Sequence, residues 1–371
     1  MSSNYPKVFL AMDNCIFYKR WTAPEEWSEK MARLGIFNIE ASADTELDPL
    51  FMGKAYLDDW LKNVEKAQTA SGVRVCNLYS GHGTYSTLGM AHDDKRVRDH
   101  MIADWFFPMV EMAGYLGCGL GFFAHAFKHS ILQDRDEYFR YVEILTEGLV
   151  RINEHAGKFK CGDLGIEQMY TPHQFPWRLE DTEYLLKEVS RRSGRNFYFT
   201  EDVGHHSRDF FRPSEYEARC WLGSDAAFAL GDAEGQAAWA EIEIDMDMNP
   251  HLFAKESDAD CYVTLSKLGC YSPIIHLQQT NGNRSVHDAF TPENNRTGII
   301  EPSKVLRAIK ESYERPADEG MPDRCREIYL TLELFSGTTS NMHNVLQDAK
   351  TSVDYWRNYI PKDGVALDEI I

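Results

Sequence analysis

The pattern of apolar and polar positions divides the chain into short β-like runs separated by longer stretches with helical spacing. The runs are rich in Val, Ile, Leu, Phe and Tyr, as strands are. Eight are predicted as strands: Lys7–Asp13, Phe37–Ser42, Arg74–Ser80, Gly119–His125, Asp163–Met169, Asn196–Asp202, Pro273–Gln278 and Ile328–Phe335. Between strands, amphipathic spacing predicts helices over Ala55–Gln68, Glu137–Ile152 and Leu179–Arg191.

Strands that alternate with helices pair in parallel, because each parallel return needs a crossover. Eight such units favour a closed (β/α)₈ barrel, and no GxGxxG fingerprint follows the first run, which disfavours a dinucleotide-binding sheet. The 371 residues suit one barrel domain, 1–371, with insertions. The intervals near 206–258 and 280–326 are longer than one helix requires. We predict that they are insertions on the catalytic face, acting as lids or subunit contacts.

Polar residues end the last four predicted strands, where a barrel builds its active site. They are Glu167, the pair Glu201-Asp202, His276 and Glu333. Alone, each fits a helix cap, a rim ion pair or a hydrogen-bonded core group. Together, buried carboxylates that converge would repel one another unless a cation lies between them. Oxygen and imidazole donors without cysteine suit Mn²⁺, Co²⁺, Mg²⁺ or Zn²⁺, so the sequence predicts one divalent metal ion.

Further polar residues near the strand ends are candidates for substrate binding. His205 follows Asp202 by three residues, at the exit of a strand, where its ring can hold a hydroxyl. Arg284 follows His276 in a polar loop and can reach a substrate oxygen or a phosphate, although an exposed arginine explains it equally well. Other candidates on earlier strands and loops are Glu40, His82, His125 and His173.

Composition narrows the class of partner. The net charge of −19 repels the phosphate backbone of nucleic acid, which makes nucleic acid a poor candidate partner. It does not exclude a small anionic substrate, because a few nearby Arg and Lys side chains can bind one phosphate. No apolar run approaches the roughly 18 residues that cross a bilayer, and the N-terminus lacks the features of a secretion signal. The eight cysteines form no CxxC pair. We therefore expect a cytoplasmic protein with a small-molecule partner and no membrane or nucleic-acid partner.

Four motifs in order along the chain resemble the xylose isomerase-like barrel superfamily. They are Gly165-Ile166-Glu167, Asp202-Val203-Gly204-His205, Ile275-His276-Leu277 followed by Arg284, and Leu332-Glu333. Within that superfamily the chain is similar to the sugar (phosphate) isomerase/epimerase group that includes D-tagatose 3-epimerase. The resemblance spans most of the barrel, and it rests on the ordered set rather than on any one motif.

The resemblance implies a ligand set and a reaction. The implied metal ligands are Glu167, Asp202, His276 and Glu333, with Mn²⁺ expected first. The first and last of these glutamates are also implied as the catalytic acid/base pair, and His205 and Arg284 as substrate-binding residues. Such a site isomerises or epimerises a small sugar or sugar phosphate by proton transfer through an enediolate.

Other interpretations stay open at this stage. The residues after the metal histidine, often a Lys-Asp pair in that group, are Gln278-Gln279 here, and Leu334–Gly337 also departs from the usual pattern. A metal-dependent lyase or dehydratase acting on a sugar acid, an inosose or a C-glycoside uses the same barrel and metal. An abasic-site endonuclease is disfavoured by the acidic charge, and a non-catalytic barrel by the intact ligand set. The sequence leaves open whether the protein is a homo-oligomer.

Overall fold

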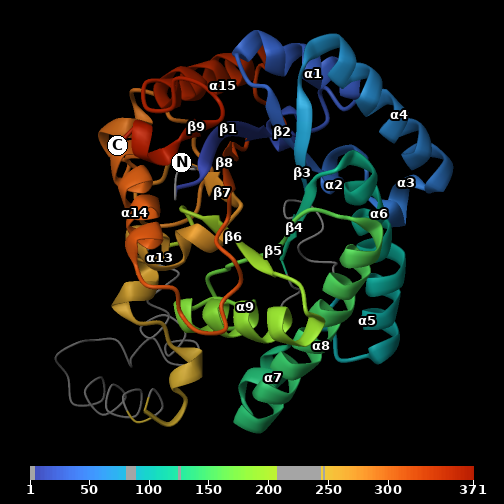
Figure 1. Ribbon diagram of the computed structural model, residues 1–371, viewed down its shortest axis with the longest axis vertical. Coiled ribbons are helices and arrows are strands. Elements are labelled where there is room, and N and C mark those ends of the chain that lie inside the picture. The colour runs from blue at the N-terminus through green and yellow to red at the C-terminus, as the bar shows by residue number, and fades with distance from the viewer. Residues whose placement is uncertain (1–4, 81–88, 124–126, 207–243, 245–246) are drawn as a thin grey trace.

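Eight parallel strands close into a barrel in the computed structural model, which describes residues 5–80, 89–123, 127–206, 244 and 247–371 (Figure 1). The strands are β1 Lys7–Asp13, β2 Asn38–Ser42, β3 Arg74–Ser80, β4 Gly119–Phe122, β5 Leu164–Glu167, β6 Tyr198–Asp202, β7 Ile274–Leu277 and β8 Glu327–Leu332. They pair in chain order from β2 to β8, and β1 pairs with both β8 and β2. The predicted (β/α)₈ fold is therefore confirmed.

All eight predicted strands are present, although several are shorter than the apolar runs that predicted them. β1 and β3 have the predicted bounds, whereas β8 ends at Leu332. Leu334 lies beyond that strand and is still buried. The apolar pattern of the sequence indicates which residues are buried, and at the mouth of the barrel burial continues past the last paired residue of the strand. Glu333 is thereby the first residue after β8.

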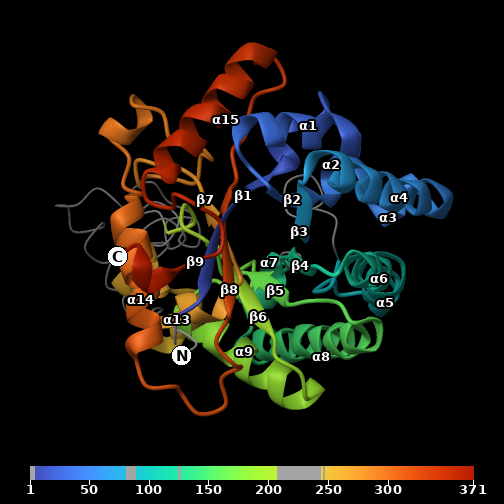
Figure 2. The ribbon, with the colours of Figure 1, turned by 45° about the horizontal axis from the view of Figure 1, so that its top comes forward.

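Helices surround the barrel on its outer side (Figures 1 and 2). The longer ones are α1 Pro24–Leu34, α4 Lys54–Ser71, α6 Phe107–Leu116, α8 Arg135–Phe159, α9 Leu179–Ser193, α13 Cys261–Leu268, α14 Pro302–Glu314 and α15 Met342–Arg357. Shorter helices are α2 Ala43–Glu46, α3 Pro49–Met52, α5 Lys95–Met101 and α7 His129–Leu132. The three predicted helices correspond to α4, α8 and α9. The short antiparallel strand β9, Val365–Ala366, pairs with the start of β1.

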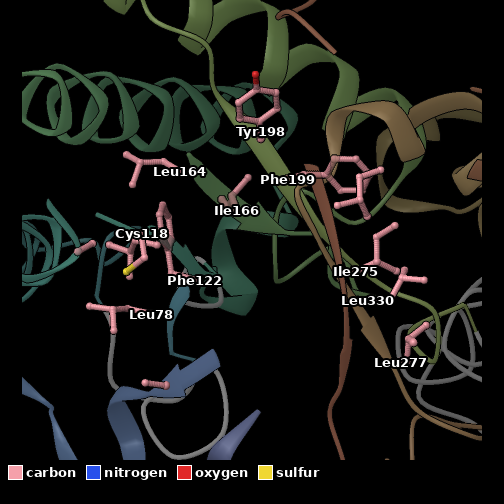
Figure 3. Close-up of a cluster of buried hydrophobic side chains, with 14 of the residues drawn as sticks. Leu78, Cys118, Phe122, Leu164, Ile166, Tyr198, Phe199, Ile275, Leu277 and Leu330 are labelled. Atoms are coloured by element: carbon pink, nitrogen blue, oxygen red, sulfur yellow. The ribbon is translucent and has the colours of Figure 1, made fainter. Parts of the chain in front are cut away.

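Along each strand, side chains point alternately toward the outer hydrophobic core and toward the interior of the barrel, where the site lies. In a closed barrel, successive residues of a strand point outward and inward. In β5, Leu164 and Ile166 are fully buried on the outer face, and Gly165 and Glu167 occupy the inner one. Figure 3 shows the outer set on consecutive strands: Leu78, Phe122, Leu164, Ile166, Phe199, Ile275, Leu277 and Leu330. These side chains pack under the helices and hold the inward residues in fixed register.

The two long intervals contain ordinary elements as well as loops. Residues 207–243 and 245–246 lie outside the described part of the chain. The segment that follows them forms the 3₁₀ helices η4 Pro250–Leu252 and η5 Glu256–Ala259. It contacts the start of α9, since Arg178 donates to the carbonyl of Pro250 at 2.9 Å. Residues 280–326 include a loop bridged by Gln279 and Asp288, and then α14. Their role as insertions stays a prediction.

Within the described residues, no helix combines the length and apolar character that a membrane span requires. The seven cysteines described there are free. Burial raises the pKa of the Cys325 and Cys118 thiols well above its usual value, so these side chains behave as small hydrophobic groups. Cys220 lies outside the described residues.

A buried imidazole in η4 makes the fold sensitive to acid. His251 is 4% exposed, and neither ring nitrogen has a hydrogen-bond partner in the described part of the chain. Burial, with Arg178 and Arg135 nearby, lowers the pKa of His251 to about 4. Because this lies below the ordinary value of 6.5, the neutral ring stabilises the fold above pH 6.5. That contribution is lost as the pH falls from about 6.5 through 4.

We therefore expect His251→Phe to lose less stability than the wild type over that pH range. Phenylalanine suits the site, because the His251 ring packs against Tyr138 and Phe139 with centroids 4.8 and 5.1 Å apart. The expected difference in the free energy of unfolding is on the order of 1–2 kcal/mol after solvent screening. Urea unfolding at the two ends of the range measures it. An equal loss in both proteins would contradict the assignment to His251.

Candidate metal centre

The four predicted ligands meet at the carboxyl ends of β5 to β8. One donor atom from each of Glu167, Asp202, His276 and Glu333 lies within 4.8 Å of all the others. His276 Nδ1 is 3.3 Å from Glu167 Oε1 and 3.2 Å from Glu333 Oε2. Register explains the convergence, because Asp202 pairs with His276 across β6 and β7 and both side chains point inward. None of the four is more than 3% exposed.

The atoms that face the centre fit a divalent cation. His276 Nδ1 and Glu333 Oε2 are buried, and neither has a hydrogen-bond partner among the described residues. On its other side, His276 Nε2 lies 2.8 Å from Glu40 Oε2. A carboxylate accepts, so Nε2 donates to Glu40, and Nδ1 is the ring nitrogen that faces the cluster and can bind a metal once it has lost its own proton. Three carboxylates and one imidazole lone pair form an oxygen-and-nitrogen donor set that divalent ions prefer.

The pKa values of neighbouring groups in the centre are shifted in opposite directions. Burial alone would raise the pKa of Glu333, but His276 and His287 outweigh it and hold that pKa well below its usual value. Burial alone would lower the pKa of His276, but Glu333 and Glu40 raise it well above the ordinary value. The carboxylates thus attract a positive charge, which either a proton or a metal ion supplies. A metal that binds Nδ1 has to displace a proton from it.

Glu40 and Tyr79 support the ligands from the far side of the barrel. Glu40 was predicted as a substrate contact, and that role stays a prediction. It lies in the middle of β2, fully buried, between His276 and the Asn77 amide, which donates to it at 2.6 Å. The Tyr79 hydroxyl donates to Glu167 Oε2. Burial and Glu167 raise the pKa of Tyr79 well above its usual value, so the hydroxyl keeps its proton. Gly121 leaves space for this ring, since a Cβ there would lie 2.8 Å from Tyr79 Cδ2.

Two imidazoles line the other side of the cluster. His205 Nδ1 is 3.0 Å from the Gln168 carbonyl, and its Nε2 is 3.2 Å from Asp202 Oδ2. His287 comes from the loop after β7, and its Nδ1 is 3.4 Å from Glu333 Oε2. Donor atoms of Asp202, His205 and His287 also lie within 4.8 Å of one another. The sequence reasoning identified His205 but missed His287 and Tyr79.

Of the other predicted substrate contacts, the two that the structure describes are not joined to the four ligands by any hydrogen bond or ion pair. His173 Nδ1 lies 2.8 Å from the Phe127 carbonyl, and no hydrogen bond or ion pair connects its ring to the ligands within the described residues. Arg284 is exposed, and its carbonyl accepts from Thr280 Oγ1 at 2.6 Å. His82 and His125 lie outside the described residues. The substrate-binding roles of all these residues stay predictions.

Glu40→Gln is expected to weaken Mn²⁺ binding about 10–100-fold, because it removes the charged partner that makes His276 a better donor. Glu46→Gln is the matched control. Glu46 is equally buried, and it accepts from Trp27 Nε1 at 2.6 Å and from Asn14 Nδ2 at 3.0 Å. Calorimetric titration of both metal-free variants measures the effect. Equal affinity in Glu40→Gln and the wild type would contradict the role given to Glu40.

Comparison with known proteins finds a similar sequence and several similar structures. No protein-family model matches the chain. The D-erythrulose 1-phosphate 3-epimerase of Brucella abortus (strain 2308) is 24% identical over 301 residues, which cover 81% of this chain and 79% of that protein.

Two solved structures share the architecture over nearly the whole chain. A protein of Rhodospirillum rubrum ATCC 11170, proposed to be a xylose isomerase, superposes with a TM-score of 0.69 at 15% identity, covering 95% of this chain and 99% of that one. The D-psicose 3-epimerase of Clostridium cellulolyticum H10, solved with D-tagatose, superposes with a TM-score of 0.58 at 12% identity, covering 95% and 98%. The resemblance seen in the sequence is confirmed, and the chain has the fold of the xylose isomerase-like barrels.

Proposed function

We propose that this protein is a divalent-metal-dependent enzyme that epimerises or isomerises a small sugar or sugar phosphate. The observation that carries the proposal is the convergence of Glu167, Asp202, His276 and Glu333 at the mouth of the barrel. The likeness to a D-erythrulose 1-phosphate 3-epimerase and to a D-psicose 3-epimerase supports it. Mn²⁺ is the metal we propose first, with Co²⁺, Mg²⁺ or Zn²⁺ as alternatives. A cytoplasmic location is part of the same proposal.

The two glutamates are suited to move a proton. A bound divalent cation polarises a carbonyl and makes the adjacent C–H more acidic. Glu167 and Glu333 each have one carboxylate oxygen near His276 Nδ1, at 3.3 and 3.2 Å. One glutamate removes the proton from the carbon next to the ketose carbonyl, which leaves an enediolate. The other returns a proton to the opposite face of that carbon, giving an epimer, or to the neighbouring carbon, giving an isomer.

The imidazole of His205 is oriented for a substrate hydroxyl. Its Nδ1–H donates to the Gln168 carbonyl, which fixes the ring and directs Nε2 toward the cluster. Arg284 is the proposed contact for a substrate oxygen or a phosphate, from the loop above β7. His82, His125 and His173 are proposed as further substrate contacts from earlier strands and loops. Such sites use a few placed polar groups within apolar walls.

Product analysis tests the proposal. The metal-free protein is reloaded with Mn²⁺ and incubated with a panel of ketoses and ketose phosphates, with and without chelator. We expect an epimer or an isomer of one substrate class, identified by NMR, and no product with chelator. A product that has lost water or an aglycone would instead identify a lyase.

A further inference from the structure

One amide side chain, Gln278, connects the proposed ligand Asp202 to the loop that carries His287. Gln278 follows β7 directly and is fully buried. Its Nε2 donates to Asp202 Oδ1 at 2.9 Å and Oδ2 at 2.8 Å. Its Oε1 accepts from the backbone N–H groups of Val286 and His287 at 3.0 and 2.6 Å. Ser285 Oγ lies 2.8 Å from Nε2 and 3.2 Å from Oε1.

These partners allow only one orientation of the amide. Oε1 faces two N–H donors, and Nε2 faces a carboxylate, which only accepts. If the amide were flipped, its NH₂ group would face the two backbone N–H donors and its oxygen would face the carboxylate. Each buried polar group left unpaired in this way costs about 1–3 kcal/mol. Gly204 makes the arrangement possible, since a Cβ there would overlap the Gln278 side chain. The Gly204 N–H donates to Asp202 Oδ1 at 2.7 Å and fixes the same carboxylate.

The loop end of this connection holds His287 in an uncommon conformation. Its φ of +52° is left-handed, which non-glycine residues adopt only when their surroundings hold them there. The Gln278 amide accepts its N–H, and its carbonyl accepts from the Phe335 N–H at 3.1 Å. The His287 ring stacks on Phe335 with centroids 3.8 Å apart, which leaves Nδ1 3.4 Å from Glu333 Oε2.

We propose that Gln278 is a positioning residue of the metal centre. It orients the Asp202 carboxylate toward the cluster and sets His287 beside Glu333, so one amide fixes both a ligand and the surroundings of the proposed acid/base glutamate. The inference rests on the proposed function, because it takes the cluster to be a metal site. It also gives a physical reason for Gln278 at a position where the sequence departs from the Lys-Asp pattern.

Gln279 provides a matched comparison one residue further along. It is also buried and also joins two segments. Its Nε2 donates to Asn295 Oδ1 at 2.9 Å and to the Ile300 carbonyl at 3.1 Å, and its Oε1 accepts from the Ile300 N–H at 3.1 Å. These contacts hold the 295–300 loop and none of them reaches the four ligands. Losing either glutamine therefore removes similar hydrogen bonds, but only Gln278 touches the proposed metal centre.

The test compares Gln278→Met with Gln279→Met. Thermal unfolding of the metal-free proteins measures the structural loss, and calorimetric titration with Mn²⁺ measures the affinity. We expect a similar loss of metal-free stability in both variants. Mn²⁺ binding should weaken about 10–100-fold in Gln278→Met alone, in the range that outer-shell partners of metal ligands contribute. Gln279→Met should bind Mn²⁺ like the wild type.

The outcomes separate this inference from the proposed function. Wild-type affinity in a folded Gln278→Met protein would overturn the positioning role, as would an equal loss of affinity in Gln279→Met. If Gln278→Met does not fold, Gln278→Asn replaces it. That variant keeps the amide but is too short to reach Asp202 and the loop together, and it should weaken Mn²⁺ binding in the same direction. Failure of the wild type to bind Mn²⁺ would instead overturn the metal site itself.

Discussion

Replacing Glu333 by Gln is expected to lower kcat by about 10²–10⁴-fold while the metal stays bound. Glu333 Oε2 faces the cluster, 3.2 Å from His276 Nδ1. A glutamine keeps the size and an oxygen donor at that position, but it does not take up and return a proton near neutral pH. Glu167→Gln is expected to have an effect of the same size, because its Oε1 faces the same nitrogen while Tyr79 holds Oε2.

A carboxylate on the outer face of β6 is the control. Glu201 is as buried as the ligands, but it pairs with His206 Nε2 at 2.8 Å rather than with the cluster. Glu201→Gln should keep kcat near the wild-type value, apart from any loss of stability. Metal content by mass spectrometry and kcat are measured on all three variants. Full activity in Glu333→Gln or Glu167→Gln would remove that residue from the acid/base pair.

His276→Asn is expected to abolish both metal binding and turnover. His276 is the one nitrogen donor among the four proposed ligands, and its Nδ1 lies within 3.3 Å of two of the carboxylates. Removing the donor leaves carboxylates that repel one another in a buried space. In the wild type, Mn²⁺ at about 100 times its Kd should stabilise the fold by about 2.7 kcal/mol. The variant should show no shift in Tm on adding the metal.

His206→Asn is the matched control for the loss of a buried imidazole. His206 Nδ1 lies 2.8 Å from the Asp258 carbonyl, and its Nε2 pairs with Glu201, so the ring bridges β6 and η5 outside the cluster. This variant should lose stability but keep the Tm shift with Mn²⁺. An undiminished shift in His276→Asn would show that the ion binds elsewhere.

The barrel and the four proposed ligands followed from the sequence because both depend on local pattern. Each strand is a short apolar run, and Glu167, Asp202, His276 and Glu333 interrupt or end such runs where a charged group is costly to bury. The parallel order of the strands then brings all their carboxyl ends to one mouth. Strand ends were less accurate, because apolar residues continue beyond the paired region at the mouth.

Residues that act across the barrel were harder to predict. From the sequence alone, Tyr79 cannot be distinguished from an ordinary aromatic residue of the core. Only the alternation of side chains along β3 indicates that Asn77 and Tyr79 both lie on the inner face. Glu40 approaches His276 because β2 and β7, which are separated by β8 and β1 in the sheet, both direct these side chains into the barrel, and a linear pattern does not show this contact. His287 lies in a loop without periodicity, and its approach to Glu333 depends on the Gln278 amide. Its position therefore depends on tertiary contacts that leave no local signal.

Exchange of a substrate C–H for deuterium, followed by NMR with Mn²⁺ and with chelator, tests the proposed proton transfer. We expect the proton on the carbon next to the carbonyl of one ketose or ketose phosphate to be replaced by deuterium in D₂O. Exchange should require the metal, and an epimer or isomer should form with it. Absence of exchange with every sugar in the panel, in a protein that binds Mn²⁺, would contradict the proposed reaction.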